Sequence, residues 1–349
     1  MTIGAHTPYA LPFCEEDMII TKPAYFDSFR CIAAACPDSC CKEWDVQVDE
    51  GSAAYYRALP GPLGDRLRQV LRSEDGETVM TIVDGRCPMW RSDGLCRIQA
   101  ELGEGALCHT CREFPRLTHD YGDFIERGLE LSCPEAARII LSALPMPPVV
   151  EELPGGEGEY DGEAMAVLKA TRETALGILA ENRPMGQVLA LLLLFGCQAQ
   201  SELDGGEPQP FDPETALEGL EDFVKPGDLS AVVEIFNSLE ILTPQWQQRL
   251  YAPASGELSQ LCRPLARYLI ERYWLQAVSD YDLYCRVKFI VVSCLLVSTL
   301  GGDFVSTAQL YSKEIENNTD NVEALLDAAY THPALTDDKL LGLLLQIRS

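Results

Sequence analysis

The chain has 349 residues and a formal net charge of -27 at pH 7, and 47% of its residues are hydrophobic. A chain of this length can bury a substantial core without disulfide bonds. Its acidic charge would repel a phosphate backbone, which argues against nucleic acid and anionic membranes as partners. The same charge would attract a lysine-bearing protein surface.

The first twenty residues lack a basic segment followed by an uninterrupted apolar stretch, so we expect no secretory signal peptide. The longest apolar run, residues 289–300, is too short to span a bilayer. We therefore expect a cytoplasmic protein. In that reducing compartment, clustered cysteines more often bind metal or act in catalysis than form disulfides.

The first part of the chain, residues 1–145, is predicted to be an irregular, cysteine-rich, metal-binding domain with a few short strands. Residues 43–50 and 77–85 alternate polar and apolar side chains, as short strands do. The cysteine-bearing segments between them are rich in Pro, Gly, Asp and Ser. Irregular backbone of this kind needs a cross-link to hold it in place, and a metal centre would supply one.

Residues 146–163 combine prolines, glycines and acids without apolar periodicity, which predicts an acidic linker. The remainder, 164–349, is expected to be an all-helical domain, so the predicted fold class is mainly α. Asp residues at or just before several helix starts are candidate N-caps, and Pro264 should start or kink its helix. Apolar residues recur at helical spacing over 163–182, 185–200, 228–242, 257–280, 283–301 and 320–330.

Nine of the 14 cysteines lie between Cys31 and Cys133. Soft thiolates grouped in this way favour zinc or an iron–sulfur cluster over hard cations. Cys87 and Cys133 each precede a proline, as ligands of iron–sulfur clusters often do. The pattern is Cys31-x4-Cys36-x3-Cys40-Cys41, then Cys87-x8-Cys96-x11-Cys108-x2-Cys111, then Cys133. Four later cysteines fall in apolar helical patterns and are assigned to the core: Cys197, Cys262, Cys285 and Cys294.

Other readings of this pattern stay open. Cys108-x2-Cys111 alone would suggest a redox pair, but no βαβ pattern surrounds it. Adjacent Cys40 and Cys41 cannot easily both face one cluster, so one of them could belong to the core. A mixed site would need His109 or His119, and we favour an all-cysteine site.

Three cysteine-anchored blocks, in the order KPAYFDSFRCIAAACPDSCCKEWDVQVD, GRCPMWRSDGLCRIQAELGEGALCHTCREFPR and RGLELSCPEAARIIL, together resemble the flagellin lysine N-methylase family. The resemblance covers about residues 22–142, and LYCRVKFIVVSCLLV also looks like the helical C-terminal part of that family. The cysteine core is similar to a wider family of small zinc- or iron-chelating domains.

This resemblance implies a protein-lysine N-methyltransferase that uses S-adenosylmethionine to methylate flagellin. It also implies a cysteine-ligated iron–sulfur cluster, with 4Fe–4S favoured and zinc as the alternative. Cys108 departs from the family's pattern and is left out of the ligand set. Carried over by position, the metal ligands are Cys31, Cys36, Cys40, Cys41, Cys87, Cys96, Cys111 and Cys133.

The residues themselves do not indicate the methyl transfer. No glycine-rich nucleotide loop follows a clear strand and no βα alternation is visible, so S-adenosylmethionine binding rests on the resemblance alone. No catalytic or cofactor-binding residue is assigned. A lysine must lose its proton before it attacks, so its site should lower the amine's pKa or offer a proton acceptor. Aromatic residues that could line such a site, although each is more readily read as core, are Tyr25, Phe26, Trp44, Trp90, Tyr268, Tyr273 and Trp274.

A second hypothesis belongs to another class of protein. In it, the chain is a non-catalytic iron–sulfur or zinc protein whose cluster is structural or senses redox state, and whose helical part binds a partner. The size of the helical part favours the enzyme. A radical mechanism is disfavoured because the Cys-x3-Cys-x2-Cys triad is absent. The sequence does not indicate an oligomeric state.

Overall fold

The computed structural model describes residues 18–41, 46–74, 76–153, 156–252 and 257–347. The described part is mainly α, as predicted, with fifteen α-helices and seven short strands. None of its helices has the length and apolar character needed to cross a membrane. The signal-peptide prediction falls largely on residues 1–17, and these residues and Trp44 lie outside the described part.

The strands form two small sheets. One has the order β5-β6-β1-β7, in which β1 runs parallel to β6 and antiparallel to β7, and β5 and β6 form an antiparallel pair. The other is antiparallel with the order β2-β4-β3. Their bounds are β1 (Met18–Lys22), β2 (Val46–Gln47), β3 (Leu71–Glu74), β4 (Glu77–Met80), β5 (Arg116–Asp120), β6 (Phe124–Leu129) and β7 (Val149–Leu153).

The turn between β5 and β6 requires glycine. Gly122 has φ +94°, and a Cβ atom there would lie 2.3 Å from the carbonyl oxygen of Glu157. No other residue adopts that backbone at so close an approach without strain. The turn therefore holds the residues after β7 against the start of β6.

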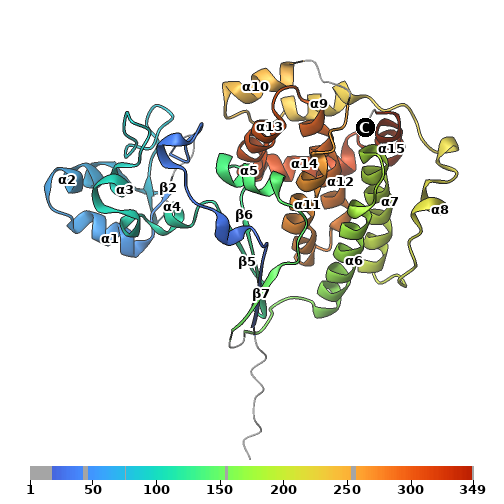
Figure 1. Cartoon of the computed structure of the whole chain (residues 1–349), viewed down its shortest axis with the longest axis horizontal. Coiled ribbons are helices and arrows are strands. Elements are labelled where there is room, and N and C mark those ends of the chain that lie inside the picture. Colours follow the sequence, from blue (N-terminus) through green and yellow to red (C-terminus); the bar gives the residue numbers. More distant parts are fainter. Residues whose placement is uncertain (1–17, 42–45, 75, 154–155, 253–256, 348–349) are drawn as a thin grey trace, which may run out of the picture.

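The first five helices are short and lie before the acidic segment. They are α1 (Glu50–Ala58), α2 (Gly61–Val70), α3 (Arg97–Leu102), α4 (His109–Glu113) and α5 (Pro134–Ser142), with the 3-10 turns η1 (Phe26–Ser28), η2 (Ala33–Ala35) and η3 (Glu104–Ala106). A hydrophobic cluster around Tyr56, Leu67 and Met89 joins α1, α2 and the second sheet. Figure 1 shows α1 to α4 and β2, in blue and cyan, gathered at one end of the molecule, whereas α5, in green, lies beside the later helices.

The later helices form the larger part of the described chain, at the other end of Figure 1. They are α6 (Gly162–Ala180), α7 (Met185–Leu203), α8 (Pro213–Leu217), α9 (Leu229–Asn237), α10 (Pro244–Tyr251), α11 (Cys262–Tyr273), α12 (Leu283–Thr299), α13 (Phe304–Tyr311), α14 (Thr319–Thr331) and α15 (Asp337–Gln346). Between them come η4 (Leu220–Asp222), η5 (Trp274–Val278) and the π-helical η6 (Ser312–Glu316). Their core also includes Phe26, Phe29, β6 and α5, and α12 is buried along its length.

All six helical segments predicted after residue 162 are present, and five of them lie within a few residues of their predicted bounds. The exception is 257–280, where α11 begins at Cys262 and is followed by η5. The carboxylates of Asp161, Asp228 and Asp282 cap α6, α9 and α12, because each accepts a backbone amide of the first turn. Pro264 lies in the first turn of α11, as expected.

Several elements carry weaker local patterns, and the sequence analysis missed them. Strand β7 lies inside the predicted linker and pairs with β1, and helices α1 to α5 interrupt the segment predicted as irregular. The division of the chain at residues 146–163 stays a prediction.

Candidate functional site

Four of the predicted ligand cysteines lie together around Cys41. Its thiol is within hydrogen-bonding reach of the sulfur atoms of Cys40, Cys87 and Cys96. The backbone amide of Cys87 also donates to the carbonyl oxygen of Cys41, at 2.8 Å. The structure therefore brings Cys40 and Cys41 to one group of thiols, although neighbours in the chain were not expected to share one.

Cys108 and Cys111 form a second pair beside this group. Their thiols hydrogen-bond to each other, and Cys111 also feels the charges of Cys96 and Cys40. Cys108 is 1% exposed and belongs to the same hydrophobic cluster as Cys87. Cys108 was not among the predicted ligands, yet the structure places it with Cys111.

The remaining three predicted ligands are Cys31, Cys36 and Cys133, and two of them lie near Cys40. Cys36 feels the charges of Cys31 and Cys40, and Cys133 feels those of Cys36 and Cys40. Burial raises the pKa of the Cys133 thiol to about 11. Cys31 is exposed and its sulfur accepts the backbone amide of Ala33. Segments far apart in the sequence therefore meet at Cys40.

The thiols differ in how readily they ionise. The hydrogen bond from Cys41 lowers the pKa of Cys96 to about 6, against the opposing effect of burial, and the amides of Ile98 and Gln99 help. Cys96 holds the N-cap position of α3, and the N-terminus of a helix favours the thiolate form of a cysteine. The same pairing raises the pKa of Cys41, the donor.

The donor set fits a soft metal by its chemistry, since its members are thiols. No group of three or more His, Cys, Asp or Glu side chains within the described ranges is arranged to hold a metal ion. The ligand set therefore stays a prediction. His109 makes its contact with Asp49 through its backbone amide, at 2.8 Å.

A second cluster of ionisable groups, which the sequence analysis did not identify, lies between the first sheet and the helices. We call it the polar seam. Three sides supply it: the sheet, helix α6, and α11 with η6. Its members are His119, Glu126, Glu130, Arg172, Arg267, Tyr268, Glu271, Arg272, Tyr273 and Glu316.

Glu316 is at the centre of the helical side of the seam. Tyr273 donates its hydroxyl hydrogen to this carboxylate at 3.0 Å, and Tyr268 does so at 3.3 Å. The guanidinium of Arg272 lies 3.4 Å from the same carboxylate, and its Cζ lies 5.5 and 5.9 Å from the ring centroids of Tyr273 and Tyr268. Glu316 ends the π-helical η6, and such segments are frequent at functional sites.

Two of the predicted aromatic residues, Tyr268 and Tyr273, are buried in the core, as expected, and direct their hydroxyl groups at Glu316. Burial raises the pKa of both phenols well above its usual range. Phe26 and Trp274 are buried in the core, as expected, and Trp274 Nε1 donates to Thr171 at 3.1 Å. Of the cysteines assigned to the core, Cys262, Cys285 and Cys294 are buried and Cys197 is exposed.

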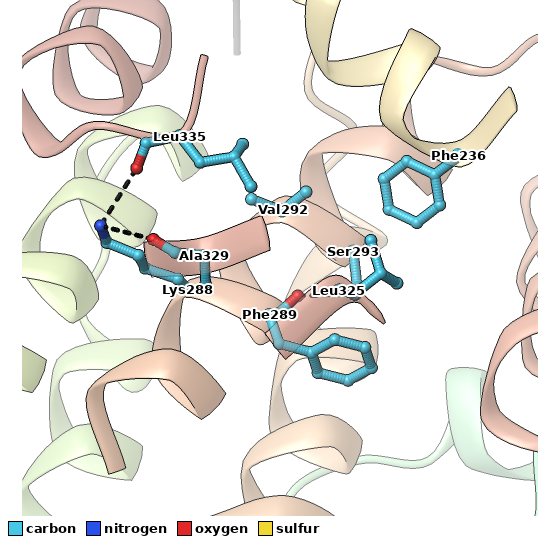
Figure 2. A pocket seen from close by; sticks show the side chains of 8 residues that line it. All are labelled: Phe236, Lys288, Phe289, Val292, Ser293, Leu325, Ala329 and Leu335. Atoms are coloured by element: carbon cyan, nitrogen blue, oxygen red, sulfur yellow. Dashed lines mark hydrogen bonds between the residues drawn. The ribbon is translucent and has the colours of Figure 1, made fainter. Parts of the chain in front are cut away.

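A small pocket beside α12 does not offer a second site. Figure 2 shows Lys288 reaching from it to the carbonyl oxygens of Ala329 and Leu335, at 3.2 and 3.0 Å. The same ammonium pairs with Asp337 at 2.8 Å. The other residues that line the pocket are mainly apolar. Through its hydrogen bond to Leu335, Lys288 holds α12 against the loop before α15.

Comparison with known proteins finds three curated relatives. Flagellar biosynthetic protein FliU of Salmonella muenchen is 34% identical over 134 residues, which cover 36% of this chain and 79% of that protein. Lysine-N-methylases of Salmonella typhimurium and Salmonella choleraesuis are 34% identical over 134 residues, and the match spans 33% of their length. No family model matches the chain, and no solved structure matches it.

Proposed function

The chain belongs to the flagellin lysine N-methylase family, and on that premise we propose that it is an S-adenosylmethionine-dependent protein-lysine N-methyltransferase that acts on flagellin. We further propose that its N-terminal cysteines hold an iron–sulfur cluster. The observation that carries the proposal is the match to FliU over 79% of that protein. The names of the two lysine-N-methylases supply the reaction class.

The thiols that meet at Cys41 support the second part of the proposal. Cys40, Cys41, Cys87, Cys96 and Cys111 would supply its ligands, with Cys108 beside Cys111. Bound there, it would tie together the loops before α3 and α4, because each of these helices begins next to a cysteine of the group. Metal binding free energy is then also folding free energy.

The metal is tested directly. Protein purified without oxygen should be brown, with visible absorption and with iron and acid-labile sulfide in similar amounts, because thiolate-bound clusters absorb visible light. Metal analysis and an absorption spectrum give the answer. Colourless protein that contains only stoichiometric zinc would refute the iron–sulfur assignment and indicate a structural zinc site.

Methyl transfer is tested with purified flagellin and S-adenosylmethionine. Lysine ε-nitrogens should gain methyl groups, detected by mass spectrometry of flagellin peptides. The rate should fall as salt is raised, because the charge of -27 steers a lysine-bearing partner and is screened over about 8 Å at physiological ionic strength. It should rise with pH toward the lysine pKa of about 10.4, because only the neutral amine is nucleophilic. Flagellin binding without any transfer would favour the non-catalytic alternative.

A further inference from the structure

Strand β7 forms an open edge of the first sheet. The sheet has the order β5-β6-β1-β7, so one side of β7 pairs with β1 and the other side faces no strand in the described part of the chain. All five residues of β7 are exposed. The backbone N–H and C=O groups along a free edge form a row with which a further strand can pair. An extended segment of another protein can bind in this way.

The surface around β7 is apolar. Fourteen large hydrophobic side chains are exposed in the described ranges, and six of them lie on β1, on β7 or in the loop before β7. Exposed apolar residues that stand alone are normal on a soluble protein, whereas a group of them indicates an interaction site. The six are Ile19, Leu144, Met146, Val149, Val150 and Leu153.

One face of the sheet becomes uncovered toward this edge. Side chains alternate along a strand, so Val150 and Glu152 share a face, and Ile19 of β1, the partner of Glu152, shares it with them. Ile19 is also paired with Phe124 of β6, and the ammonium of Lys169 from α6 lies 3.5 Å from the centroid of that ring. Helix α6 therefore covers this face at β6, whereas Ile19 is 44% and Val150 55% exposed.

The charge around β7 indicates which kind of partner fits. Between Arg138 and Lys169 the sequence has six acidic residues and no basic residue. On β7 itself, Glu151 pairs with Lys22 of β1 at 2.6 Å, whereas Glu152 forms no ion pair with any residue that the structure describes. A partner with a cationic side chain beside Glu152 would complement this charge.

A second copy of the chain does not fit this edge. In an antiparallel pair of two β7 strands centred on Glu151, the two Glu151 side chains would face each other. Like charges directly opposite each other destabilise a sheet, and two chains that each carry a charge of -27 repel. A segment that alternates apolar and lysine side chains fits both Val150 and Glu152, because these two residues lie two positions apart on one face.

We propose that β7 binds an extended, lysine-bearing segment of the protein substrate, which adds to the sheet as a fifth strand. This inference rests on the proposed function and adds to it the surface that docks the substrate. Backbone hydrogen bonds along the free edge hold the segment. Val150 packs against one of its apolar side chains, and Glu152 pairs with the ammonium of a lysine.

The first test measures binding and methylation of flagellin by full-length variants. Val150→Lys and Glu152→Lys should each raise the Kd for flagellin about tenfold or more, because each places a positive charge beside a cationic segment. The KM for methylation should rise by a similar factor while kcat stays unchanged, since a docking contact contributes equally to the ground state and the transition state.

Two exposed positions outside the sheet supply matched controls. Val83 is 59% exposed, close to the value for Val150, and Glu221 is an exposed residue of η4. Val83→Lys and Glu221→Lys repeat the two changes of charge away from β7, and both should keep the wild-type Kd and KM. Equal losses in the test variants and the controls would overturn the inference, because net charge alone would then explain them.

Hydrogen exchange locates the contact on the full chain. The amides of residues 149–153 should exchange more slowly when flagellin is added, because the free N–H groups of the edge gain partners. The amides of β5, at the other edge of the sheet, should not change. If the β7 amides exchange slowly to the same extent without flagellin, another part of the chain or a second copy already covers the edge, and the inference is overturned.

The outcome for docking is separable from the outcome for the reaction. A wild type that methylates flagellin without any protection of β7, and whose KM the two variants share, overturns the docking inference alone. A wild type that binds flagellin through β7 but transfers no methyl group overturns the proposed function alone. Flagellin that neither binds nor is methylated overturns both.

Discussion

Replacing Cys87, Cys96 or Cys111 by serine is expected to remove most of the bound metal and much of the soluble fold. These thiols belong to the group around Cys41 and the Cys108 pair. The free energy of metal binding at small cysteine sites is about 10–16 kcal/mol, and a domain's free energy of unfolding is usually only about 5–15 kcal/mol. A variant that loses a ligand, and with it the metal, is therefore expected to unfold. Metal content per chain and the yield of soluble protein measure the effect.

Two buried cysteines serve as the control for this experiment. Cys262 and Cys294 are fully buried between α11 and α12, in the helical core rather than in the thiol group. Cys262→Ser and Cys294→Ser should keep the wild-type metal content and lose only packing energy. The same metal content in all five variants would refute the ligand assignment.

Arg172→Ala is expected to lower the free energy of unfolding by about 3–5 kcal/mol, because it leaves the carboxylate of Glu126 without its partner in a partly buried position. The Arg172 and Glu126 side chains are 14% and 18% exposed. Arg172 is on α6 and Glu126 on β6, so the lost pair is one that joins the sheet to the helices. Urea unfolding followed by circular dichroism measures the change.

An exposed pair of the same type is the matched control. Arg138 holds Glu135 through bonds of 2.6 and 2.9 Å, but its side chain is 61% exposed. Arg138→Ala should therefore cost at most about 1 kcal/mol. A double variant, Arg172→Met with Glu126→Met, should recover much of the loss, because no unpaired charge remains. Equal losses in Arg172→Ala and Arg138→Ala would show that burial does not set the strength of the first pair.

Local pattern alone determined much of the helical part. Helices such as α6, α7 and α12 were predicted because apolar residues recur at helical spacing over 15 or more positions. The capping carboxylates were predicted because an Asp before a helix start accepts amides only two or three residues away. Such signals lie within a few residues of each other, so the sequence carries them without any knowledge of the fold.

The order of the cysteines was enough to predict a thiol site, but only the fold decided which thiols meet. It joined Cys41 to Cys87 and Cys96. The β5-β6-β1-β7 sheet likewise pairs residues 18–22 with residues 149–153, more than a hundred positions apart. The spacing of residues along the chain does not indicate such pairings, because they depend on how distant segments pack against each other.

The polar seam shows the same limit. His119, Glu130, Arg172, Arg272 and Glu316 come from five separate segments, and none stands in a motif that marks it. In the sequence, His119 was only a possible metal ligand. Its unfilled nitrogen and the unpaired carboxylate of Glu130 became visible once β5 and β6 were placed against α11 and η6. The sequence determined which ionisable groups exist, and tertiary packing decided which of them pair with one another.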